Sequence, residues 1–264
     1  MASKLSHPKA EVSKLSIVLA FLFGIVWGSF LNVCIYRLPK GMSIIRPPSF
    51  CPFCNCPIKP YDNIPPSEVF LILKGRCRNC KGKIPLRYPL VELMGGLLGV
   101  FCLLKFPSLL KALPYFLFLS GLLVSSFIDF EHQIIPDEIS LGGIIGGFLF
   151  SLFGLTIPLR SSLLGALFGG GILFLLGFLY ERFTKREGMG GGDVKLLGMI
   201  GSFLGVKGAM FSLFMGSLLG LLFSLPFVLK RKDPLKSPIP FGPFLSSGAF
   251  LYLIFGEKLK VIWG

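Results

Sequence analysis

Apolar runs long enough to cross a membrane recur along the whole sequence. A membrane-spanning helix needs about 20 apolar residues, and somewhat fewer when polar side chains at its ends reach the interface. Eight candidate runs occupy residues 15–36, 90–104, 109–128, 139–156, 162–180, 194–206, 209–229 and 241–255. The second and sixth of these runs are short and contain glycine. The pattern predicts an all-α, polytopic membrane helix bundle with about eight transmembrane helices.

The composition argues against a soluble or a disordered chain. Hydrophobic residues make up 53% of the sequence and charged residues only 15%, against roughly 25% charged residues in an average soluble protein. A soluble domain of this size could not bury so much apolar surface in one core. Disordered chains are poor in the aromatic and aliphatic residues that are abundant here. Because no small-x-small cleavage site closes the first apolar run, we expect that run to remain as a helix.

Glycine is frequent inside the predicted spans. Small residues let membrane helices approach each other closely. We therefore expect close helix contacts at Gly95, Gly96, Gly142, Gly143, Gly146, Gly147, Gly169, Gly170 and Gly171.

The formal net charge of +14 is explained by the loops between the spans. If the N-terminus lies outside, the inner segments hold 17 Lys and Arg residues and the outer segments hold nine. Cytoplasmic loops of membrane proteins are enriched in basic residues. We therefore expect both termini on the side opposite the cytoplasm, with the lipid bilayer as a partner and no nucleic-acid partner.

Only one sizeable hydrophilic segment interrupts the apolar runs. The sequence divides into an N-terminal tail with the first transmembrane helix (1–36), a cytoplasmic loop domain (37–89) and a membrane domain of about seven helices (90–264). A loop domain of about fifty residues is too small for a self-supporting core, so it needs a cross-link or a metal.

Two C-x-x-C pairs can provide such a cross-link or metal site. Cys51 and Cys54 form the first pair, and Cys77 and Cys80 form the second. This spacing suits a tetrahedral Zn²⁺ ion, and four sulfur ligands leave no open position, so the metal would be structural. A disulfide or metal-free form is the alternative, although the cytoplasm is reducing. Cys56 is either a competing ligand or a bystander.

Two carboxylates lie at the ends of apolar runs. Asp129 follows the third run, and Asp193 precedes the sixth. On the predicted topology both reach the cytoplasmic face, where they could approach each other. Ionisable residues at such positions are candidates for function. Two neighbouring carboxyl groups share a proton, so one acts as base on a water while the other polarises a carbonyl, as in aspartic proteases.

Other protease chemistries lack their residues. The sequence has no H-E-x-x-H motif, and its only histidines are His7 and His132. The structural alternative is that Asp129 and Asp137 end or cap helices and that 188–192 is a flexible turn. Three successive glycines directly before a membrane-edge carboxylate favour function, because they let backbone lie close to it.

An ordered set of motifs resembles the type IV prepilin peptidases, the membrane aspartyl proteases that process type IV pilins and the pseudopilins of type II secretion. The motifs are Gly28-Ser29-Phe30-Leu31-Asn32-Val33, Tyr36-Arg37-Leu38-Pro39, the double C-x-x-C loop, Arg87-Tyr88-Pro89-Leu90-Val91-Glu92, Ile128-Asp129, His132-Gln133, Ile135-Pro136-Asp137, Gly190–Asp193 with Lys195, and Pro238-Ile239-Pro240-Phe241-Gly242-Pro243. The resemblance implies that Asp129 and Asp193 are the catalytic pair in a helix bundle with its N-terminus outside. Glu131 stands where many relatives carry Asp.

The resemblance also implies a second activity. Members with the cysteine loop commonly cut a short basic leader from prepilin and then methylate the new N-terminal residue with S-adenosylmethionine. No Rossmann-type glycine fingerprint for that cofactor is present, so the methyltransferase role rests on the resemblance. The alternatives are a peptidase without methyltransferase activity, a proton-coupled transporter that uses Asp129, Asp193 and Glu92, and a zinc-stapled assembly factor.

Overall fold

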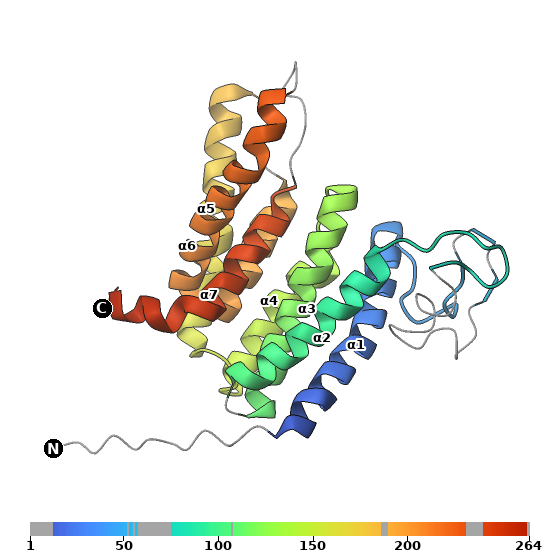
Figure 1. Ribbon diagram of the computed structural model, residues 1–264. Coiled ribbons are helices and arrows are strands. Elements are labelled where there is room, and N and C mark those ends of the chain that lie inside the picture. Colours follow the sequence, from blue (N-terminus) through green and yellow to red (C-terminus); the bar gives the residue numbers. More distant parts are fainter. Residues whose placement is uncertain are drawn as a thin grey trace. The chain divides into compact units, whose positions relative to one another are not determined.

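A computed structural model of the chain describes residues 13–51, 53–54, 56–57, 75–106, 108–185, 190–230 and 240–262. Most of the predicted loop domain between the cysteine pairs, residues 188–189, and Pro238 and Ile239 of the last motif lie outside the described residues. Helices dominate the described residues (Figure 1), which contain no strand beyond two isolated bridges. The α-helices are α1 (Lys14–Arg37), α2 (Arg87–Lys105), α3 (Leu109–His132), α4 (Asp137–Leu152), α5 (Leu159–Thr184), α6 (Gly191–Lys230) and α7 (Gly242–Ile262).

The helices have the length and the surface that a bilayer requires. Five segments are long and apolar enough to cross a membrane, namely Lys14–Lys40, Arg87–Lys105, Leu109–His132, Leu159–Thr184 and Gly191–Phe223. Large apolar side chains stand exposed along α5, including Leu164, Leu167, Phe174, Phe178 and Phe183. Exposed apolar surface of this extent is stable only against lipid or another apolar partner. The predicted all-α membrane bundle is confirmed.

Helix α6 is interrupted at Gly205. This residue has φ 73° and ψ −176°, a backbone conformation that is outside the helical region and that glycine adopts without a steric penalty. The interruption falls at the end of the sixth predicted apolar run (194–206), just before the seventh run begins at residue 209.

The two segments of α6 run in opposite directions. The side chain of Ile135 lies against both Gly192, at the start of α6, and Gly242, at the start of α7. Gly220, late in the second segment, lies against the Phe244 ring in the first turn of α7. Residues 192 and 220 therefore lie at the same end of these helices, so the chain reverses between them. With α6 counted as two segments, the described residues hold eight α-helical segments, whereas five helices are long and apolar enough to cross a membrane by themselves.

The chain divides into two compact units. The first comprises residues up to Val33 together with Ile45–Phe116, and the second comprises Cys34–Ile44 and the chain from Leu117 onward. In the first unit α1 and α2 pack closely through Gly24 and Gly95, where a Cβ atom on either glycine would overlap the backbone of the other helix.

In the second unit α5 and α6 make a similar contact. A Cβ on Gly165 or Gly201 would overlap the facing backbone carbonyl, and nearby the Ser162 hydroxyl donates a hydrogen bond of 2.6 Å to the Ser202 carbonyl. Neither glycine was among those singled out from the sequence.

The glycine predictions are confirmed in part. Added Cβ atoms at Gly95, Gly96, Gly143, Gly147 and Gly169 would meet a neighbouring helix at short distance, and one at Gly170 would make ordinary contacts. Gly142 and Gly171 have open space around them, and Gly146 meets only a side chain of its own helix. The prediction is wrong for these last three, because a glycine on a lipid-facing surface has the same sequence signature as one in a helix contact.

Candidate active site and cysteine cluster

Asp129 lies in the last turn of α3 and is fixed by backbone groups. Its carboxylate accepts a hydrogen bond of 2.8 Å from the Gly242 N–H, and its side chain is buried, with 6% of the residue exposed. Helix α3 ends just beyond it, because Gln133 adopts a left-handed conformation (φ 57°) and donates its N–H to the Asp129 carbonyl. Position 242 must be glycine for this approach, since a Cβ there would lie 2.8 Å from the carboxylate oxygen.

Asp193 lies in the first turn of α6. Its backbone N–H donates to the Gly190 carbonyl at 3.1 Å, which closes the turn that begins the helix. One carboxylate oxygen, Oδ1, is buried without a hydrogen-bond partner in the described part of the chain. A buried polar atom without a partner calls for an explanation. Here it leaves an acceptor available to a water or a substrate.

Ile135 connects the surroundings of the two carboxylates. This buried side chain would lie 3.0 Å from a Cβ at Gly192, the neighbour of Asp193, and 3.3 Å from one at Gly242, the partner of Asp129. The two carboxyl groups lie close enough for the charge of Asp129 to act on Asp193. The structure thus brings together two residues that are separated by 64 positions in the sequence.

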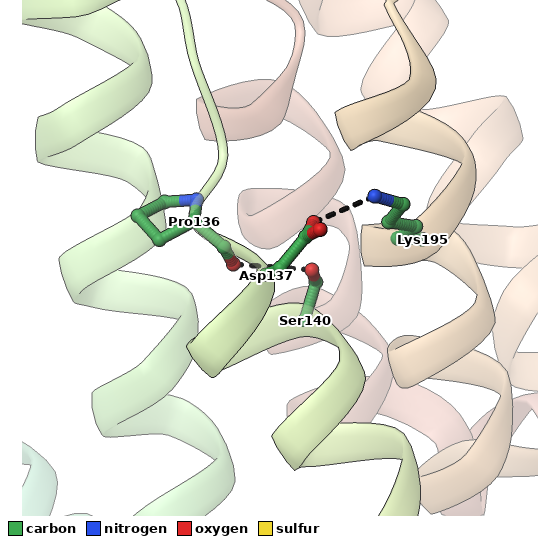
Figure 2. Close-up of polar contacts among 4 residues, drawn as sticks. All are labelled: Pro136, Asp137, Ser140 and Lys195. Carbon is green, nitrogen blue, oxygen red and sulfur yellow. Dashed lines mark hydrogen bonds and ion pairs between the residues drawn. The ribbon is translucent and has the colours of Figure 1, made fainter. Parts of the chain in front are cut away.

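An ion pair joins the starts of α4 and α6 beside this site (Figure 2). Lys195 Nζ lies 2.6 Å from Asp137 Oδ1, and the two side chains are 38% and 57% exposed. The structural alternative in which Asp137 caps the fourth span does not hold. Pro136 occupies the N-cap position without a side-chain cap, and Asp137 is the first residue of α4, with its carboxylate directed to Lys195. Ser140 closes the turn by donating to the Pro136 carbonyl at 3.1 Å.

The junction of α3 and α4, residues 129–138, is acidic and reaches solvent. Residues 129–138 contain four carboxylates and no Lys or Arg. Glu131 and Glu138 are exposed, whereas Asp129 is buried. Glu131 lies 4.0 Å from the His132 imidazole. The segment therefore combines one buried carboxylate with an exposed negative surface.

The four cysteines of the C-x-x-C pairs form one group in the first unit. The sulfur atoms of Cys51, Cys54, Cys77 and Cys80 all lie within 4.8 Å of one another and could hold a metal ion. The two pairs have matching turns. The Cys51 N–H donates to the carbonyl of the residue five positions later, and the Cys77 N–H does the same, both at 2.9 Å.

Backbone amides favour the metal-binding thiolate form at two of the four cysteines. A hydrogen bond from the Cys56 backbone lowers the pKa of Cys54 to about 6. Hydrogen bonds from the Cys80 and Asn79 backbone amides lower the pKa of Cys77. The thiolate is the form of cysteine that binds metals, so the turns prepare these two sulfurs for a cation.

Cys56 lies beside the four-sulfur group and is not a member of it. The Asn79 side-chain amide donates to the Cys56 sulfur at 3.0 Å. Of the two interpretations that the sequence allowed, this contact favours a bystander.

Comparisons with known proteins cover most of the chain. Residues 22–106 match a family model described as the bacterial peptidase A24 N-terminal domain, and residues 116–225 match the type IV leader peptidase family. A prepilin leader peptidase/N-methyltransferase of Aeromonas salmonicida is 36% identical over 266 residues, covering 91% of each chain. Proteins of the same name from Pseudomonas aeruginosa (35% identical, 96% of this chain and 93% of the relative) and Neisseria gonorrhoeae (35%, 80% and 82%) are also similar. No solved structure matches.

Proposed function

The chain belongs to the type IV leader peptidase family, and we propose that it removes the short basic leader from type IV prepilins or type II secretion pseudopilins and methylates the new N-terminal residue. The relatives named prepilin leader peptidase/N-methyltransferase match the chain over most of its length. The observation that supports the peptidase activity best is the pairing of Asp129, held by a backbone amide, with Asp193, which has a buried oxygen without a partner among the described residues.

In the proposed mechanism one of the two aspartates acts as the general base and the other as the general acid. One carboxylate removes a proton from the attacking water, and the other, protonated, donates to the scissile carbonyl oxygen. The Gly242 N–H fixes the orientation of Asp129. The buried Oδ1 of Asp193 is suited to hold the water or the substrate. No nucleophilic side chain is required.

We further propose that Cys51, Cys54, Cys77 and Cys80 bind a structural Zn²⁺ ion. Four sulfur atoms within 4.8 Å of one another match the donor set and the size of a tetrahedral zinc site. A site of four thiolates has no open position for water or substrate, so its contribution is to hold the turns of the loop together.

The methyltransferase activity would use S-adenosylmethionine as methyl donor. The names of the relatives support methylation. Leader removal precedes methylation in this scheme, because the methylated amine exists only after cleavage.

The distribution of basic residues supports an orientation in the cytoplasmic (inner) membrane. The excess of Lys and Arg in alternate loops predicts both termini outside and Asp129 and Asp193 at the cytoplasmic face. A basic leader would then approach the carboxylates from the cytoplasm while the hydrophobic stem of the pilin stays in the bilayer.

One experiment tests both activities. Detergent-purified protein is incubated with a prepilin and S-adenosylmethionine, and the product masses are measured. We expect loss of the leader, followed by a gain of about 14 Da, the mass of one methylene, which removes no charge. A substrate that keeps its leader would refute the peptidase. Cleavage without the added mass would refute the methyltransferase alone.

A further inference from the structure

Glu92 is a buried carboxyl group in α2 that the peptidase mechanism does not use. It is 9% exposed, and it is the only carboxylate among the described residues of the first unit. No basic side chain pairs with it in that part of the chain. An ionisable residue inside an apolar membrane helix is costly, and it generally marks a functional site.

The surroundings of Glu92 hold more hydrogen-bond acceptors than donors. The Ser29 hydroxyl of α1 donates a hydrogen bond to Glu92. Asn32, which is 2% exposed, donates its amide N–H groups to the carbonyls of Tyr88 at 3.0 Å and Gly28 at 3.3 Å. Its amide oxygen Oδ1 is buried and has no partner among the described residues. The carboxylate and this oxygen therefore call for a ligand that donates hydrogen bonds.

The two acceptors lie on facing turns of α1 and α2. A Cβ at Gly28 would lie 2.6 Å from the Cα of Glu92, so these two residues face each other across the helix contact. Asn32 follows Gly28 by one helical turn, and its partner Tyr88 precedes Glu92 by one turn. One turn corresponds to about 5.4 Å along the axis. Both acceptors thus belong to one buried patch.

The depth and chemistry of this patch suit a primary amine. Glu92 lies five residues inside α2, about 7.5 Å from the end that adjoins the cysteine loop. A protonated amine supplies a positive charge and several N–H donors in a small volume. In the proposed function, cleavage creates such a group, because the new N-terminal amine directly precedes the apolar stem of the pilin.

We propose that Glu92 and Asn32 receive the new N-terminal amine of the cleaved pilin for methylation, an inference that rests on the proposed function. An α-amino group has an ordinary pKa of about 8 and is mostly protonated at neutral pH, whereas only the neutral amine is a nucleophile. Glu92 accepts one proton from the ammonium and leaves a neutral amine. The neutral amine would then attack the methyl group of S-adenosylmethionine, the methyl donor that the proposed function requires: the N–C bond would form as the C–S bond breaks, and the electron pair of the broken bond would stay on sulfur. The product is an N-methylammonium.

The first test is Glu92→Gln, which keeps the shape of the side chain and removes the base. The protein carries its own folding control, since the peptidase pair Asp129 and Asp193 belongs to the other unit. We expect leader removal near the wild-type rate and a loss of about a hundredfold in the rate of the 14 Da gain, as for loss of a general base. Glu92→Asp keeps the carboxylate and should restore part of the methylation.

A binding measurement without cofactor provides a second readout. A detergent-solubilised peptide that begins at the new N-terminal residue is compared with the same peptide after N-acetylation. We expect acetylation to weaken binding to the wild-type protein at least tenfold and to have little effect on binding to the Glu92→Gln protein.

Three results would overturn the proposal: methylation by Glu92→Gln at the wild-type rate, equal discrimination between the two peptides by both proteins, or parallel loss of cleavage and methylation in the Glu92→Gln and Glu92→Asp proteins. The last would mean that the carboxylate serves the fold. A wild-type protein that cleaves and never methylates would instead refute the methyltransferase function itself.

Discussion

The carboxylate pair and the cysteine group are each assembled from distant segments, but different forces position them. Asp129 and Asp193 sit at helix ends, and the contacts that place them are a backbone amide from a third helix and the packing of Ile135. The four cysteines sit in two short turns, which are ordered by a few backbone hydrogen bonds. The carboxylate pair is part of the packed bundle, whereas the conformation of the cysteine group depends on what its sulfur atoms bind.

This difference predicts how each region responds to change. A conservative substitution at either carboxylate should abolish leader cleavage and leave the fold intact, because the surrounding packing does not depend on the charge. Replacing the cysteines should unfold the cysteine loop and leave leader cleavage in place. The reason is that a small metal-bound module takes most of its stability from the metal.

The largest effect is expected at the carboxylate pair. Asp129→Asn and Asp193→Asn should each reduce leader cleavage to below a few per cent of the wild-type rate, because the amide is nearly isosteric but cannot exchange the proton. In Asp129→Asn the new amide oxygen could still accept from the Gly242 N–H, so helix packing should be retained. Cleavage is measured by product mass, and folding by circular dichroism and thermal unfolding. Activity above a few per cent in either variant would remove that residue from the catalytic pair.

The second effect is expected at the cysteine group. Cys51→Ser combined with Cys54→Ser, or a strong chelator, should unfold the turns of the loop and leave the transmembrane helices folded. Metal binding contributes on the order of 10 kcal/mol in small zinc modules. We expect methylation to decrease more than cleavage, since the proposed peptidase pair, Asp129 and Asp193, lies in the other unit.

Cys56→Ser is the matched control for this prediction, because Cys56 lies outside the four-sulfur group. It should retain one zinc per chain by elemental analysis and keep the protease resistance of the loop. Fully active, freshly purified protein that contains no zinc would contradict the assignment of the metal.

The helices were predictable because a bilayer imposes a length and a polarity on each span. The run 109–128 became α3, and its apolar character ended within one turn of the helix end. The fourth run extended to residue 156, whereas α4 ends at Leu152. Gly154 follows with φ 68°, and a turn inside an apolar stretch has no signature in hydropathy.

The candidate site residues were predictable from the sequence only where the residue type itself indicates a chemical role. Asp129, Asp193 and the four cysteines are rare residue types at distinctive positions. The hydrogen bond between Gly242 and Asp129 joins residues 113 positions apart, and the Lys195–Asp137 pair joins residues 58 apart. Such contacts depend on which helices pack together, and one sequence does not encode that locally.

The third effect concerns the ion pair beside the carboxylates. Lys195→Met and Asp137→Asn should each lower kcat/KM by no more than about fivefold, because exposed ion pairs contribute roughly 0–1 kcal/mol. Asp137→Asn therefore keeps much of its activity. The double variant should be no worse than either single variant, since both remove the same interaction. Losses above tenfold, or losses that multiply in the double variant, would show that one of these residues acts on the chemistry directly.

The smallest effect is expected at the exposed acidic residues at the junction of α3 and α4. Basic loops elsewhere at the proposed cytoplasmic face should repel a basic leader, whereas Glu131 and Glu138 should attract it while Asp129 stays buried at the scissile bond. Charges in solvent are screened over about 8 Å at physiological salt. Glu131→Gln combined with Glu138→Gln should therefore raise KM severalfold at low salt and little at physiological salt, with kcat nearly unchanged. Leaders in which two or more lysines are replaced by glutamine separate attraction from a general defect: the difference in KM between variant and wild type should shrink with each lysine removed. A difference that stays constant across those leaders would mean that these carboxylates only face water.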